Sequence, residues 1–137
     1  MEQCDYLLRQ IQQMAQFFAA VIRKLTGLKE ENSEEEIQQA TDEMLLEQLD
    51  LQIPDILKRQ HGETAEWIVK KKGIHIQNLD LFAEILLLNA KACKDDEKKQ
   101  QLLEAILEIY CYADQHSDTF SMDRQVKAVE VKKMLRL

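Results

Sequence analysis

An apolar stripe through residues 7–28 constrains the fold of this chain more than any other feature of its sequence. Its members recur at alternating spacings of four and three, a 3.5-residue repeat held for three heptads. Side chains with this period line up on one side of an α-helix, so we predict a long first helix over residues 1–28. Gly27 is expected to end the helix near Leu25 by taking a left-handed conformation. The stripe consists of Leu7, Ile11, Met14, Phe18, Val21, Leu25 and Leu28.

The composition extends the helical prediction to the rest of the chain. Its 137 residues include only three glycines and one proline, so tight hairpins between strands have few places to form. Leucine, glutamine, glutamate, lysine and alanine dominate instead, and all are strong helix formers. We therefore predict an all-α fold of six or seven antiparallel helices, either an irregular bundle or tetratricopeptide-like hairpins. A chain of this length fits one domain, 1–137.

Shorter helices are predicted between residues 33 and 73. Ser33 followed by Glu36 has the form of a capping box, in which each side chain accepts a hydrogen bond from the other's backbone N–H. Proline suits the first turn of a helix, and an isolated glycine is a frequent helix stop. The next two helices are expected at Asp55 to about Gln60, after Pro54, and at Thr64 to Lys71, before Gly73.

Two longer helices are predicted over residues 78–116 and a last one over residues 121–137. The first pair is separated only by the turn at residues 94–97, and so short a connection makes the two helices antiparallel. Ser121 is expected to cap the last helix, with acidic and basic residues placed to match the helix dipole. The residues expected to face inward are Val126, Val129 and Met134.

The formal net charge of −7 is unevenly distributed along the chain. Residues 29–50 hold nine acidic side chains and one basic one, whereas residues 121–137 hold five basic and two acidic ones. A negative surface repels phosphate backbones, so we expect no nucleic-acid binding. Both segments are expected to be solvated helix faces; the alternative is that they contact each other or a charged partner.

The cysteine pattern and the first residues predict a cytoplasmic protein. The three cysteines include no CxxC pair, which is typical of thiols in a reducing compartment. Cys93 and Cys111 lie in helical apolar stripes and are expected to be core residues. Residues 1–5 are acidic, unlike a signal peptide, and the longest apolar run, Phe17–Ile22, is too short to span a bilayer.

Glu31 and Glu34, followed after twelve residues by Glu47 and Asp50, form the one acidic pattern of interest. Its letters resemble the metal-binding motif of all-α nucleotide pyrophosphohydrolases, in which acids from two facing helices hold Mg²⁺. Here Glu34 and Glu47 are predicted on one helix, about 20 Å apart, too far to share an ion. A metal-dependent nucleotide hydrolase is therefore the least favoured alternative.

No other pattern predicts catalysis, a metal centre or a cofactor. His61, His75 and His116 lie at helix ends or in loops without a second ligand at metal-binding spacing. The glycines are isolated, so no phosphate-binding loop is present. We expect no catalytic, cofactor-binding or metal-ligating residue, and the chain is predicted not to be an enzyme.

Two segments carry a resemblance to known sequences: Asp5-Tyr6-Leu7-Leu8-Arg9-Gln10-Ile11 and Thr119-Phe120-Ser121-Met122-Asp123-Arg124-Gln125. They resemble an uncharacterised bacterial family of short all-helical proteins, over essentially the whole chain. The resemblance implies a bacterial cytosolic protein and supplies no activity. The candidate protein-contact residues are Tyr6, Arg9 and Arg124 from these segments, and the single tryptophan, Trp67, which is otherwise expected to be partly buried in the core.

The predicted pair over residues 78–116 is also similar to a tetratricopeptide hairpin. Leu86, Ala90 and Cys93 approximate the size pattern of that motif's first helix. Leu102 stands where the motif has alanine, no closing proline follows, and no second copy lies about 34 residues away. The similarity implies a single degenerate repeat at most.

These features favour a non-catalytic protein–protein interaction module. A second hypothesis is a structural protein that self-associates through its N-terminal helix, because a 3.5-residue stripe suits a helix–helix dimer as well as an internal core. We expect a protein partner or a homodimer, and no cofactor, nucleic acid or membrane.

Overall fold

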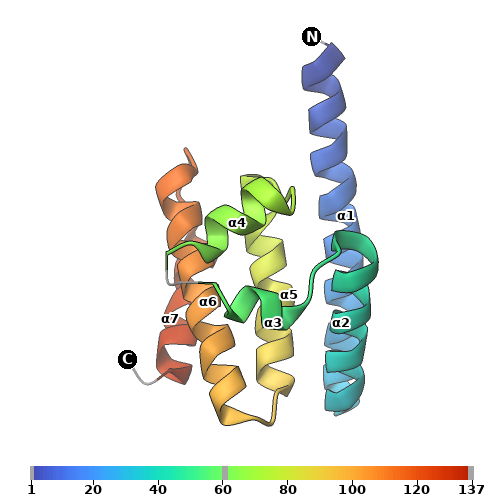
Figure 1. Cartoon of the computed structure of the whole chain (residues 1–137), viewed down its shortest axis with the longest axis vertical. Coiled ribbons are helices and arrows are strands. Elements are labelled where there is room, and N and C mark those ends of the chain that lie inside the picture. Colours follow the sequence, from blue (N-terminus) through green and yellow to red (C-terminus); the bar gives the residue numbers. More distant parts are fainter. Residues whose placement is uncertain (1, 60–61, 136–137) are drawn as a thin grey trace.

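A computed structural model describes residues 2–59 and 62–135, which form seven α-helices and one 3₁₀ turn without any strand. The all-α prediction is confirmed. Figure 1 shows the helices in their order along the chain. They are α1 (Glu2–Glu30), α2 (Glu34–Leu49), α3 (Ile53–Leu57), α4 (Thr64–Lys71), the 3₁₀ turn η1 (Ile76–Asn78), α5 (Leu79–Ala92), α6 (Asp96–His116) and α7 (Met122–Met134).

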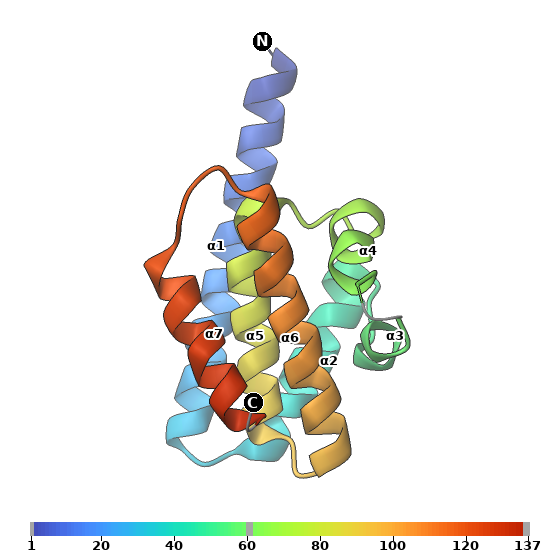
Figure 2. The ribbon, with the colours of Figure 1, turned by 90° about the vertical axis from the view of Figure 1, so that its left-hand side faces the viewer.

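The central helix of the bundle is α5. The α1–α2 hairpin packs along one side of it, and α6 packs antiparallel along another (Figure 1). On the side away from α1, α7 contacts α6 and forms ion pairs with α5. The short helices α3 and α4 pack on α6 (Figure 2). Within the described ranges, no helix combines the length and apolarity needed to cross a bilayer.

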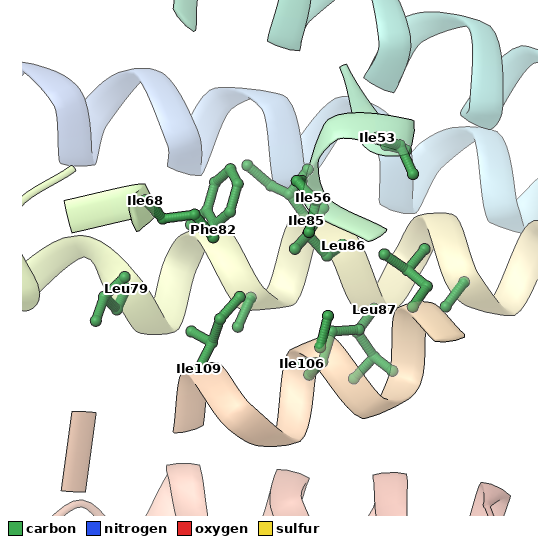
Figure 3. Close-up of a cluster of buried hydrophobic side chains, with 14 of the residues drawn as sticks. Ile53, Ile56, Ile68, Leu79, Phe82, Ile85, Leu86, Leu87, Ile106 and Ile109 are labelled. Carbon is green, nitrogen blue, oxygen red and sulfur yellow. The ribbon is translucent and has the colours of Figure 1, made fainter. Parts of the chain in front are cut away.

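The hydrophobic core surrounds α5. Phe82 of α5 is fully buried and meets Phe18 of α1, with ring centroids 6.0 Å apart. Figure 3 shows the buried α5 side chains beside isoleucines from three other helices. These are Ile53 and Ile56 of α3, Ile68 of α4, and Ile106 and Ile109 of α6. The two short helices therefore complete the core between α1 and α6.

The first helix continues through Gly27, contrary to the expectation that this glycine ends it. Asn32 takes the left-handed conformation instead, with φ 58°. The N–H of Ser33 donates to the carbonyl of Leu28 over 2.9 Å, and the N–H of Asn32 donates to that of Lys29 over 3.0 Å. These two bonds define a Schellman motif, in which asparagine is the usual substitute for glycine.

The capping box predicted at Ser33 is wrong. Ser33 precedes α2, but its side chain makes no capping hydrogen bond. Its ψ of 64° differs from the extended conformation of most N-caps, because the same residue closes the Schellman turn of α1. The third helix is also shifted, to 53–57 from the predicted 55–60, although Pro54 lies in its first turn as expected. Gln60 lies outside the described residues.

Local signals place the fourth helix and the start of the last helix correctly. The fourth helix spans the predicted residues 64–71, and Gly73 after it has φ 73°. The hydroxyl of Ser121 accepts a hydrogen bond from the N–H of Arg124 over 3.1 Å, which confirms the N-cap of α7. Each of these signals acts within a few residues, so it operates whatever the rest of the chain does.

Two predictions of side-chain orientation are wrong. Val126 and Val129, expected to face inward, are 60% and 50% exposed. Cys111 is exposed as well, whereas Cys93 is buried as predicted. In α7 the reason is that Arg124 is turned inward to meet acidic partners on α5 and α6, which rotates the valines toward solvent.

Candidate contact surfaces

The first two turns of α1 project beyond the other helices, as Figures 1 and 2 both show. We name residues 4–10 the α1 tip; every one of them is exposed. Tyr6, Leu7 and Leu8 are 61%, 49% and 51% exposed, and Arg9 is exposed beside them. Three large apolar side chains in sequence on a projecting helix form an uncovered apolar surface, which is typical of a contact site.

A cleft of about 510 Å³ lies at the base of the α1 tip. The amide of the buried Asn78 donates to the carbonyl of Ile11 over 3.1 Å, which fixes η1 against α1 and holds one wall of the cleft. No aspartate, glutamate, lysine or arginine is among its described lining residues, so the cleft suits an apolar occupant. The lining consists of Leu7, Gln10, Ile11, Gln13, Met14, Phe17, Gln48, Leu49, Val69, Gly73, His75 and Asn78.

Trp67 is half-buried and packs against the core, as one of its two predicted environments required. The guanidinium of Arg59 lies 4.0 Å from the centroid of the indole ring, and the ammonium of Lys72 lies 5.5 Å away. Lys72 also donates to the carbonyl of Asp50 over 2.6 Å. Cation–π contacts of this kind cover the indole face with side chains of the same protein. Trp67 therefore adds no exposed aromatic ring to the surface that the α1 tip presents.

Arg124 is only 6% exposed and is bound within the protein. Its Nε and Nη2 donate to the two carboxylate oxygens of Asp80 on α5, over 2.7 and 3.0 Å, and its Nη1 donates to Asp114 on α6 over 2.7 Å. The hydrogen bonds to Asp80 are the main reason that the pKa of Arg124 is raised above its ordinary value. This arginine therefore joins three helices, and its guanidinium is not presented to a partner.

Two further ion pairs join α7 to α5. Lys127 pairs with Glu84 over 2.9 Å, and Glu130 pairs with Lys91 over 2.6 Å. Arg124, Lys127 and Glu130 are spaced by three, so these pairs follow one side of α7. We name them, with Arg124, the α7 ion-pair row.

The opposite side of α7 is apolar and exposed. We name Met122, Val126 and Val129 the α7 outer stripe; Met122 is 67% exposed. Phe120, just before the helix, is 74% exposed. Sequence reasoning missed this surface because the spacing of the two valines fits an inward stripe equally well.

Glu108 of α6 is a second residue that sequence reasoning missed. Its carboxylate accepts from the N–H of Gly62 over 2.7 Å and from the N–H of Ala65 over 2.8 Å. It thus satisfies the free N–H groups at the start of α4, a helix whose own N-cap residue makes no side-chain bond. No local signal could reveal this cap, since its two halves lie more than 40 residues apart.

The acidic and imidazole residues do not converge. Glu34 and Glu47 lie on one helix, α2, as predicted, and nowhere in the described ranges do three metal-binding side chains gather. His75 accepts from the N–H of Gln77, and His116 stacks on Tyr112 with ring centroids 3.9 Å apart. His61 lies outside the described residues.

Tyr110 of α6 is a buried phenol whose hydroxyl has no hydrogen-bond partner in the described part of the chain. Burial raises the pKa of Tyr110, and the nearby carboxylates of Asp80 and Glu84 raise it further. The ionised form is strongly disfavoured there, so this tyrosine is a neutral core residue at physiological pH.

No protein family, curated protein or solved structure was found to match this chain. Its function therefore has to be inferred from its own surfaces. The two uncovered apolar surfaces on the described residues, the α1 tip and the α7 outer stripe, lie on helices at opposite edges of the bundle in Figure 1.

Proposed function

We propose that the protein is a non-catalytic protein–protein interaction module and that the α1 tip, with the cleft at its base, contacts the partner. The observation that carries this proposal is the exposure of Tyr6, Leu7 and Leu8 on turns that no other described element covers. Exposed tyrosine and leucine beside an apolar cleft are typical of binding surfaces, whereas an isolated soluble chain gains nothing from them.

The chemistry of the surface indicates the kind of partner. The α1 tip is a helix with its apolar side uncovered, and the cleft continues that side with Met14 and Phe17. An amphipathic helix of another protein fits such a surface, with anchors at helical spacing packed along α1. Arg9, exposed on the tip, is placed to pair with an acidic residue at the edge of that helix.

Site-specific photo-crosslinking tests this proposal. A photoreactive phenylalanine analogue replaces Tyr6, and in a matched control it replaces Gln39, an exposed residue of α2. We expect one protein species to be captured from position 6 and not from position 39 in cells of the natural host. The captured protein, purified, should bind the unmodified chain in solution.

Substitution of the same surface completes the test. Leu7→Glu places a charge at the centre of the contact and should weaken binding of the purified partner at least about 100-fold, with no change in the helical circular dichroism. Leu46→Glu is the control, because Leu46 is a similarly exposed leucine on α2. Equal binding by the Leu7→Glu and Leu46→Glu chains contradicts the proposal.

Self-association through the same helix is the second candidate. The heptad stripe extends back one step from Leu7 to Cys4, and both positions are exposed. In a parallel pair of α1 helices, the Cys4 thiols of the two copies would meet. In a Cys111→Ser chain, which removes the other exposed cysteine, mild oxidation should then give a disulfide dimer that Leu7→Glu abolishes. Oxidation that leaves only monomer excludes this candidate.

A further inference from the structure

The last helix carries apolar residues on two sides, and only one of these sides is buried. Its inner side holds Arg124 and the α7 ion-pair row together with the fully buried Val131, and its apolar outer stripe is exposed on the other side. An amphipathic helix normally turns its apolar side to the core, because burial of apolar surface is the main gain in docking it. The α7 ion-pair row and the buried Val131 set this rotation of α7, so the outer stripe is exposed in the folded monomer.

The outer stripe has the spacing of a helix–helix seam. Met122, Val126 and Val129 are separated by four and three residues, and Lys133 continues the series after four more. If two copies of α7 lie antiparallel, Val126 of each copy meets Val129 of the other. Met122 then lies against the aliphatic stem of Lys133. The stripe is thus complementary to itself.

The charges at the two ends of α7 select the antiparallel direction. Asp123 is exposed in the first turn, and Lys132 and Lys133 are exposed in the last. Antiparallel pairing brings Asp123 of one copy beside Lys133 of the other, twice, whereas parallel pairing sets like charges against each other. The nearer charges, Lys127 and Glu130, are already paired with α5.

We infer that the α7 outer stripe is the contact between two copies of this chain, paired antiparallel about a two-fold axis. The interface is isologous: each copy contributes the same residues. It lies away from the α1 tip, so a dimer presents two tips and two clefts to other proteins (Figure 1).

The size of the surface sets the strength of the dimer. A helix of 13 residues is about 20 Å long, so the pair buries less than the roughly 1,200 Å² of a standard stable interface. We therefore expect a reversible dimer with a dissociation constant in the micromolar range. Phe120, which precedes the stripe, adds apolar area at each end.

Sedimentation velocity of the full chain tests the inference, over concentrations from about 5 to about 500 µM, which bracket weak specific association. We expect a monomer–dimer equilibrium, weakened at least about tenfold by Val126→Glu, because the charge is placed in the seam. Leu46→Glu and Leu7→Glu carry the same charge elsewhere and should leave the equilibrium unchanged. A monomer throughout, or equal weakening by all three variants, overturns the inference.

A charge exchange separates the α7 contact from any folding effect. Asp123→Lys alone and Lys133→Glu alone each set like charges together in an antiparallel homodimer, and each should weaken it about tenfold. Mixed together, the two variants restore both opposite-charge contacts and should associate as tightly as the unmodified chain. Failure of the mixture to recover means that α7 does not pair in this way.

The result is independent of the proposed partner. If Leu7→Glu rather than Val126→Glu removes the dimer, the contact lies on α1 and the inference is overturned, while the second candidate above gains support. If Val126→Glu removes the dimer and partner binding at the α1 tip persists, both the inference and the interaction function stand.

Discussion

The first helix buries Phe18 and Leu25 completely in the core, whereas the last helix buries an arginine and leaves Val126 and Val129 exposed. Both helices carry apolar residues at helical spacing, but α7 buries fewer of them and adds charged contacts to the bundle. Along α1 the docking force is removal of apolar surface from water, which depends little on salt. Along α7 the burial of Val131 is joined by a row of charged contacts between partly exposed groups, which salt screens.

The contrast shows that charged contacts can share the docking of a terminal helix with the burial of apolar residues. α7 is attached through Arg124, whose two carboxylate partners lie on different helices. Such an attachment leaves the apolar side free for another use, at the cost of a weaker hold. We expect α7 to open locally before α1 does, and the substitutions below measure how far the two attachments differ.

Phe18→Ala should have the largest effect. Phe18 is fully buried and contacts the ring of Phe82, so its truncation leaves a cavity between α1 and α5. We expect a loss of about 3–5 kcal/mol in the free energy of unfolding. Urea unfolding followed by circular dichroism measures it. Leu7 lies on the same stripe but is exposed, so Leu7→Ala should change the free energy of unfolding by less than about 0.5 kcal/mol. If Leu7→Ala and Phe18→Ala have equal effects, Leu7 belongs to the core and not to the exposed α1 tip.

Arg124→Ala should come next, with a loss of about 2–3 kcal/mol, because Asp80 and Asp114 are left close together without their common partner. The two carboxylates are partly exposed, which keeps the loss below that of a fully buried pair. Urea unfolding at low and at high salt tests whether this loss is electrostatic. The difference in the free energy of unfolding between the unmodified chain and the Arg124→Ala chain should become smaller as the salt concentration rises. If this difference in the free energy of unfolding is the same at both salt concentrations, α7 is held by apolar contacts, as α1 is.

Several features of the fold follow from local signals, although the local signals at Gly27 and Ser33 fail. The bounds of α4, the N-cap at Ser121 and the antiparallel α5–α6 pair all follow from residues within one or two turns. The rotation of α7 does not, because it depends on where Asp80 lies, 44 residues earlier in the chain. Two sides of α7 carry apolar residues at helical spacing. The packing of the whole bundle determines which of the two sides is buried.

The candidate surfaces show the same division. The apolar stripe of α1 was predicted in full, but the point at which the bundle stops covering it was not. That point depends on the lengths of α5 and η1, against which α1 packs. Tyr6 and Arg9, in the first of the two segments that carry the resemblance, are exposed on the tip, whereas Arg124, in the second, is buried. A short motif identifies a segment without showing which of its side chains face solvent.

Tyr110→Phe probes the core beside the ion-pair row. Its hydroxyl is buried without a partner in the described residues, so its removal should raise the free energy of unfolding by about 0.5–1 kcal/mol at neutral pH. Thermal and urea unfolding measure the change. A loss of stability would show that the hydroxyl has a bonding partner, such as a bound water.

The pH dependence of the same variant has a definite sign. Burial raises the pKa of Tyr110 in the folded chain, so above about pH 10 the unfolded chain loses this proton first and stability falls as pH rises. Phenylalanine has no such proton. The advantage of the Tyr110→Phe chain should therefore grow above about pH 10 and stay constant below it, since all other titrating groups are shared.

Val126→Ala should have the smallest effect. This valine faces solvent from the outer stripe, so at a concentration well below the dissociation constant of the dimer the free energy of unfolding should change by less than about 0.5 kcal/mol. Val131→Ala is the matched control on the same helix: Val131 is fully buried, and its truncation should cost about 1–3 kcal/mol.

At several hundred micromolar, a dimer through α7 adds its own stabilisation to the folded chain, and Val126→Ala should then reduce the apparent stability by an amount that grows with concentration. A cost for Val126→Ala that is large at every concentration would mean that this valine is buried in the monomer. α7 would then be an ordinary apolar attachment, and its contrast with α1 would disappear.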